Sequence, residues 1–279
     1  MNATRKLKKS SVGVELVRLL AAEGNRVFST EQARDLSARA GIKKPYLLEA
    51  LHHLHRNGWI VPLRRGFYSL ASAIPGVPVA HEFEIAMVLV HPAAISHWSA
   101  LHYNGLTEQI PRRVFVLTTT EARIPRARGK KAKSEGGGYV IGEAIYQFIQ
   151  VKPDRFFGTE EVWVGDARVT MTNPARTLLD GLMRPQFCGD FSEVLHAFQT
   201  ASDHLLLSEI ISYALRLDTA TIKRLGWVLE NQGIDSDLIL PLLHAPIRGY
   251  RPLDPSSQRA GPCNRRWMIQ ENLPGKVLL

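Results

Sequence analysis

Apolar residues recur at helical spacing near the start of the chain. Residues 11–24 predict a helix that ends at Gly24, with an apolar face made of Val12, Leu16, Leu19 and Leu20. A second helix is predicted over Thr30–Arg39, because Ser29 and Gln32 have the spacing of a capping box. With a third helix directly afterwards, these short elements predict a helix-turn-helix unit.

The third predicted helix, within residues 42–58, separates apolar from polar positions. At about 100° per residue, one side carries Leu47, Ala50, Leu51 and Leu54. The opposite side and its flanks carry Pro45, Tyr46, Glu49, His52, His53 and Arg56, after Lys43 and Lys44 at the N-terminal end. We expect the first side to pack on the preceding helices and the second to be free to enter a DNA major groove. Glu49 would repel phosphate, but it can accept from a cytosine amino group.

Two β-forming runs, 59–63 and 67–70, follow at once and predict a hairpin with Arg64, Arg65 and Gly66 in its turn. A hairpin in this position is typical of the wing of a winged helix, whose tip lies beside the DNA backbone or minor groove, where arginine is favoured. An ordinary exposed turn is the alternative interpretation.

The basic tail Thr4–Lys9 is expected to be flexible. Its lysines, Lys8 and Lys9 among them, either reach DNA phosphates or only keep the chain in solution.

The remaining chain predicts a second, mixed domain. Residues 71–80 carry two prolines, a glycine and no charge, so we expect a winged-helix domain over 1–72, a linker over 73–80 and a second domain over 81–279. After two helices at 81–90 and 95–106, strands are predicted at Val114–Thr118, Ala144–Val151, Glu161–Val164 and Arg168–Met171. Helices follow at 174–182, 191–200, 205–215, 219–231 and 236–244. The predicted fold class is α+β, with strands first and helices after in the second domain.

Charge supports a polyanionic partner. The chain has a net charge of +9, and residues 1–70 hold 13 Lys and Arg against 5 Asp and Glu. A second basic block, 112–133, holds 8 against 1 and contains the basic loop Arg123–Lys133. Clustered positive charge is the electrostatic footprint of nucleic-acid binding. For the loop, an exposed connection between strands is the alternative.

Several other functions lack their sequence signals. No run of 18 uncharged apolar residues occurs, so neither a membrane span nor a membrane partner is expected. Two distant cysteines argue against a disulfide framework and fit the cytoplasm. His52 and His55 have helical ligand spacing, but no third ligand follows, so no metal or cofactor is expected. Walker, GxSxG and nuclease-type acid–lysine motifs are absent, which argues against an enzyme.

Five stretches together resemble a known family: LHRNGWIVPLRRGFYSL, ISHWSALHYNGL, VTMTNPARTLLDGL, LGWVLENQG and CNRRWMIQEN. In this order they resemble the AbiEi-type antitoxins of type IV toxin–antitoxin systems, which act in abortive infection. The resemblance implies a winged helix that represses its own operon at the promoter, and a second domain that counters a nucleotidyltransferase toxin. Arg56, Arg64 and Arg65 fall in the family's winged-helix segment.

The chain departs from the family in one segment. The family usually has Ser-Pro-Glu-Arg-Thr-Leu-Leu-Asp, and this chain has Ala175 in place of the Glu. If that Glu acts in neutralisation, the antitoxin role is in question, whereas a helix-capping Glu would leave the role unchanged. Arg176 and Asp180, four residues apart, are expected to form a structural pair.

The resulting hypothesis is a DNA-binding antitoxin that is not an enzyme. Its predicted partners are double-stranded DNA of its own promoter and a nucleotidyltransferase toxin. Two alternatives stay open: a stand-alone transcriptional regulator with a sensing or dimerising second domain, and a nuclease that the winged helix targets to DNA.

Overall fold

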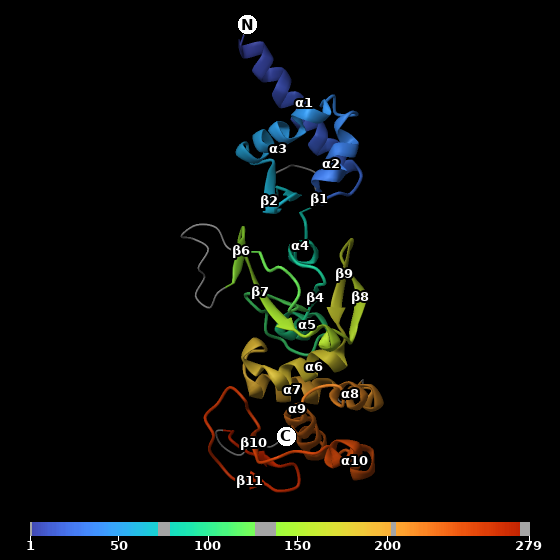
Figure 1. Ribbon diagram of the computed structural model, residues 1–279, viewed down its shortest axis with the longest axis vertical. Coiled ribbons are helices and arrows are strands. Elements are labelled where there is room, and N and C mark those ends of the chain that lie inside the picture. Colours follow the sequence, from blue (N-terminus) through green and yellow to red (C-terminus); the bar gives the residue numbers. More distant parts are fainter. Residues whose placement is uncertain (1, 72–78, 126–137, 202–204, 274–279) are drawn as a thin grey trace. The chain divides into compact units, whose positions relative to one another are not determined.

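The structure is a computed structural model that describes residues 2–71, 79–125, 138–201 and 205–273 (Figure 1). The chain divides into two compact units. The first comprises residues 1–91, 124–126 and 164–167, and the second comprises 92–123, 127–163 and 168–279. Helix α4 (Glu82–Leu89) therefore belongs to the first unit. Most of the predicted linker 73–80 lies outside the described residues, and the domain boundaries predicted from the sequence stay a proposal.

The first unit begins with three helices and a small sheet. Its elements in chain order are α1 (Asn2–Ala22), β1 (Val27–Ser29), α2 (Thr30–Ser37), the 3-10 turn η1 (Lys44–Tyr46), α3 (Leu47–Arg56), β2 (Ile60–Arg64) and β3 (Phe67–Leu70). The strands form an antiparallel sheet in the order β1-β3-β2. Together they make a winged helix, in which β2 and β3 are the hairpin predicted from the sequence.

Local signals account for the helix boundaries of this unit. Both hydrogen bonds of the capping box form, because the Ser29 hydroxyl accepts from the Gln32 amide and the Gln32 side chain accepts from the Ser29 amide. Gly41 and Gly58 follow α2 and α3 with positive φ angles of 75° and 73°, the backbone region that glycine enters without strain.

One expectation for this unit is wrong, and one strand was not predicted from the sequence. Helix α1 starts at Asn2, so the segment Thr4–Lys9 is helical and not a flexible tail. No glycine or proline interrupts residues 2–12, and lysine, arginine and leucine are good helix formers, so α1 continues to the start of the chain. Strand β1 was not predicted, because three residues carry no periodicity of their own and this strand exists by pairing with β3.

The second unit contains a six-stranded mixed sheet in the order β6-β7-β5-β4-β9-β8. Its strands are β4 (Ala94–Ile95), β5 (Val114–Thr119), β6 (Tyr139–Ile141), β7 (Ala144–Val151), β8 (Thr159–Val164) and β9 (Ala167–Thr172). Strand β5 is buried along its whole length, and it pairs parallel with β7 and antiparallel with β4. The four longer strands match the sequence prediction, whereas β4 and β6 are too short to give a pattern.

The helices of this unit pack around a hydrophobic core. They are α5 (His97–Tyr103), α6 (Pro174–Met183), α7 (Phe191–Ala201), α8 (Leu207–Ala214), α9 (Thr219–Asn231) and α10 (Ser236–His244), with short turns η3 (Pro153–Arg155) and η4 (Pro185–Phe187). Helix α6 is central, because eight of its ten residues are buried and it packs against α5, α7, α8 and α9. Asn173 caps α6 by accepting from the Arg176 amide, as its position before Pro174 predicts.

The last described segment packs onto α9. Strands β10 (Arg251–Pro252), β11 (Cys263–Asn264) and β12 (Ile269–Gln270) form a small sheet beside the fully buried Trp267. The Trp267 indole nitrogen donates to Glu230, and the Trp227 indole nitrogen donates to Glu271. The stretches LGWVLENQG and CNRRWMIQEN, far apart in sequence, are therefore one packed unit.

Gly226 tests this packing directly. A Cβ atom added there would overlap the Trp267 ring, so we expect Gly226→Ala to lower the free energy of unfolding of the second unit by at least about 2 kcal/mol. Urea denaturation measures the change. Gly13→Ala in α1 is the matched control, because its Cβ would meet only the end of the Leu54 side chain, at 3.2 Å. Equal stability of Gly226→Ala and the wild type would contradict the packing.

Candidate nucleic-acid interface

Helix α3 divides into a buried and an exposed face, as its sequence predicts. Leu47, Leu51 and Leu54 are at most 4% exposed and join the core formed with α1 and α2, while Ala50 is half-buried at its edge. This packing fixes the rotation of the helix about its axis. The face opposite the core is consequently a fixed surface.

The exposed face contains every α3 residue proposed from the sequence. The exposed side chains are Lys43, Lys44, Pro45, Tyr46, Glu49, His52, His53 and Arg56. Sequence reasoning missed Leu48, which is 66% exposed in the first turn of α3. The sequence did indicate that residue 48 is exposed, because the buried apolar stripe of α3 is complete without it.

Local contacts involve part of this face. The Glu49 carboxylate lies 3.7 Å from the His53 Nε2 atom one turn later, so the acid has a partner on its own helix. His55 places its Nδ1 atom 3.3 Å from the Ile60 carbonyl and so connects the helix to β2. Within the described residues, no three His, Cys, Asp or Glu side chains gather in a group that could hold a metal.

The two arginines of the wing have different surroundings. The Arg64 Nε atom donates to the Val88 carbonyl at the end of α4, and its guanidinium lies 4.0 Å from the centre of the Phe67 ring. Arg65 is exposed, and its side chain makes no hydrogen bond or ion pair with a described residue. The sequence places both arginines at the tip; in the structure Arg65 is free to reach a ligand, whereas Arg64 is exposed but engaged through its Nε atom and its ring contact.

The turn of the wing is attached to the start of α2. The Gly66 carbonyl accepts from both the amide and the hydroxyl of Thr30, at 2.8 and 3.2 Å. Gly66 has a φ of 79°, which a side chain would strain. The Arg65–Gly66 turn is therefore held in place relative to the helices.

Two further sequence candidates are only partly described. The backbone of Lys8 and Lys9 is part of α1. Of the basic loop Arg123–Lys133, residues 126–133 are outside the described residues, and Arg123 is exposed.

The winged helix corresponds to a known protein family. Residues 15–71 match the model of the family described as "Transcriptional regulator, AbiEi antitoxin". These residues are therefore similar to the transcriptional-regulator domain of the AbiEi antitoxins. A regulator of this kind implies binding to DNA, and the matched residues run from α1 to the end of the wing.

The likeness in fold to known proteins extends beyond residues 15–71. A solved structure, the RV2827C protein from Mycobacterium tuberculosis, superimposes with a TM-score of 0.67 over 92% of this chain and 90% of its own, at 13% sequence identity. At this identity the likeness concerns the fold alone. No curated protein matches the chain.

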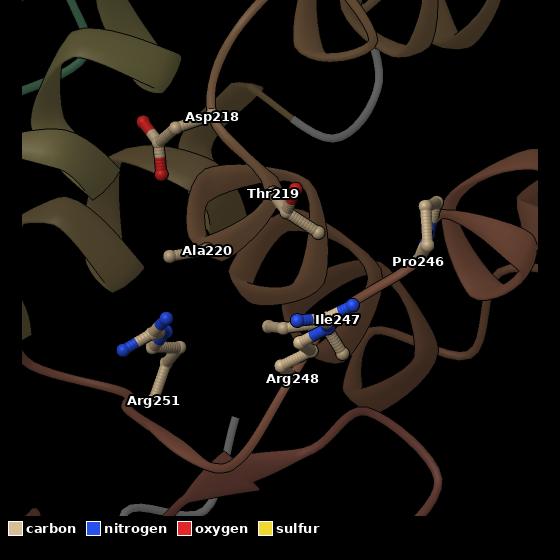
Figure 2. A pocket seen from close by; sticks show the side chains of 7 residues that line it. All are labelled: Asp218, Thr219, Ala220, Pro246, Ile247, Arg248 and Arg251. Atoms are coloured by element: carbon tan, nitrogen blue, oxygen red, sulfur yellow. The ribbon is translucent and has the colours of Figure 1, made fainter.

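A cavity of about 350 Å³ lies in the second unit (Figure 2). It lies at the start of α9 and is lined by Asp218, Thr219, Ala220, Pro246, Ile247, Arg248 and Arg251. The Asp218 carboxylate accepts from the amide and hydroxyl of Thr221 and so caps the helix. The negative charge that a helix N-terminus favours therefore comes from the chain itself.

Polar side chains are buried where α5 meets α6. The Arg176 Nε atom lies 2.9 Å from an Asp180 oxygen, and both side chains are at most 1% exposed, so the predicted pair forms. Arg176 also donates to the carbonyls of Arg155 and Phe157. Ala175, where the AbiEi family usually has Glu, is 1% exposed and belongs to the core. The acidic group is thus missing from a buried position.

His97 belongs to the same buried region. It is 1% exposed, its Nδ1 atom lies 2.9 Å from the Ser96 hydroxyl, and its φ is 49°. Burial lowers the pKa of His97 to about 4, because the charged ring would lose its hydration. The ring is therefore neutral at physiological pH.

This burial predicts a pH-dependent stability. Below about pH 6.5 the unfolded chain protonates His97 and the folded chain does not, so the free energy of unfolding falls until about pH 4. The expected loss from this residue is about 3 kcal/mol. In His97→Asn, whose side chain tolerates positive φ, the loss over this pH range should be smaller by that amount in urea denaturation. His196→Asn, at an exposed site, is the control. Identical pH curves for wild type and His97→Asn would contradict the assignment.

Proposed function

We propose that the protein is a DNA-binding antitoxin that represses its own operon and counters a nucleotidyltransferase toxin without being an enzyme itself. The winged helix binds the promoter, and the second unit provides the antitoxin function. The observation that carries the proposal is the exposed face of α3, which lies within residues matching the AbiEi regulator family.

Charge and exposure support the role of α3. The side chains of Lys43, Lys44 and Arg56 are exposed and make no hydrogen bond or ion pair with a described residue. The two lysines lie at the N-terminal end of the helix, which recognition helices commonly present to base edges. In this proposal Arg56 reads a base and the lysines contact phosphates, together with Tyr46, His52 and His53.

The wing adds a second contact through Arg65. Its guanidinium is free, and the turn that carries it is held by Thr30. Arg64 instead positions the wing, since its side chain is engaged with Val88 and Phe67.

The antitoxin role rests on the family and on the second unit. The fold likeness to the RV2827C protein includes this unit, since it covers 92% of the chain. Ala175 stands where the family usually has Glu. It is buried in the core, where its side chain is not available to a partner. In this proposal the family's Glu only caps the helix, so its replacement by Ala175 leaves the antitoxin role unchanged.

The division of labour between the wing arginines predicts different salt dependences. We expect Arg65→Ala to weaken binding to DNA and to make the slope of log Kobs against log salt shallower by about 0.9 for each phosphate that the side chain neutralises in the wild type. Arg64→Ala should move the wing and lower the melting temperature of the first unit. Anisotropy titrations across a salt series measure the slope, with Arg259→Ala, an exposed arginine of the second unit, as control. An unchanged slope in Arg65→Ala would remove the wing from the interface.

Arg56 separates the two proposed activities. Arg56→Ala should weaken specific binding by about 1–3 kcal/mol and so relieve repression of a reporter driven by the protein's own promoter. The same variant should still protect cells from the nucleotidyltransferase toxin, because that role belongs to the second unit. Arg259→Ala is the control for both assays. Full repression by Arg56→Ala would contradict the DNA-reading role, and loss of protection would assign neutralisation to the winged helix.

A further inference from the structure

Two large apolar side chains are exposed at the start of α3. Tyr46 is 58% exposed and Leu48 is 66% exposed. Leu48 lies about 100° around the helix from Leu47, outside the buried stripe, and so contributes little to the core. Single exposed apolar residues are ordinary on protein surfaces, but this pair occupies the end of the helix that the proposed function places in the groove.

Leu48 begins a row of exposed side chains along α3. Leu48, His52 and Arg56 follow at four-residue spacing and therefore lie on one side of the helix, one turn apart. All three are exposed. The row is apolar at its N-terminal end and cationic at its C-terminal end.

The charges around Leu48 favour a nucleic acid over an apolar protein surface as its occupant. Lys43 and Lys44 precede it in the same exposed segment. Glu49, the acid next to it, lies 3.7 Å from His53 on the same helix. The major groove of DNA at a thymine has anionic phosphates along its edges and a methyl group within it. An apolar side chain preceded by free cations complements such a surface.

We propose that Leu48 recognises a thymine through its 5-methyl group in the major groove of the operator. Leucine has no hydrogen-bonding group, so it cannot select among the polar edges of the bases. Thymine alone of the four bases presents a methyl group there. Leu48 is thus a specificity residue, while Arg56 at the other end of the row reads a polar base edge. This inference rests on the proposed function.

Deoxyuridine substitution isolates the methyl group, since it removes this group and keeps every hydrogen-bonding atom of the base. The duplex is the protein's own upstream DNA, and each thymine within its footprint is replaced in turn. With the full-length wild type, we expect Kd to rise roughly three- to fivefold at one thymine in each bound site, as for removal of one buried methyl group. Leu48→Ala should bind the unmodified duplex more weakly by a similar factor and should be insensitive at that thymine.

Two variants serve as controls. Leu48→Met keeps an apolar side chain of similar length and should retain the sensitivity to deoxyuridine. Leu238→Ala shortens a leucine that is 54% exposed on α10 of the second unit, and it should behave as the wild type. Thermal unfolding of each variant establishes that it is folded.

The outcomes distinguish this inference from the proposed function. If the wild type prefers its upstream duplex to a scrambled one but no thymine responds, or if Leu48→Ala responds as strongly as the wild type, the inference is wrong and DNA binding stands. If the wild type shows no preference between the duplexes, the proposed function fails and the inference fails with it.

Discussion

The packing of Leu47, Leu51 and Leu54 against α1 and α2 is the contact on which the proposed DNA interface depends. These side chains are almost fully buried, and their close packing fixes the rotation of α3 about its axis. The residues on the opposite face then share one fixed surface. Shortening any of the three leucines would loosen the whole surface at once, because these side chains join α3 to the core.

The wing depends on a second set of contacts. The Gly66 carbonyl accepts from Thr30 at the start of α2, and β3 pairs with β1. Arg64 adds a hydrogen bond to α4, so the hairpin is attached to helices on both sides. These contacts explain how a short turn presents Arg65 in a defined place. They also give the two arginines, adjacent in sequence, different roles in the proposal.

The sequence predicts the features that local patterns determine. The faces of α3, the caps at Ser29 and Asn173 and the longer strands need only nearby residues, and the structure confirms them. Strands β1 and β4 form by pairing with strands that are distant in sequence. They are three and two residues long, which is too short for a pattern of apolar and polar positions. The contact of Arg64 with Val88 spans 24 residues, and no periodicity contains it. Leu48 was overlooked because an exposed leucine resembles a core residue in sequence.

The proposed function requires that the exposed face of α3 reads a DNA sequence. Its most direct test is titration of the full-length protein with its own upstream duplex and with a scrambled duplex of the same composition, at about 150 mM salt. We expect binding to the native duplex to be tighter by roughly 10³-fold or more. Equal affinity for both duplexes, falling steeply with salt, would mean that the basic residues supply only non-specific attraction, and would contradict the claim.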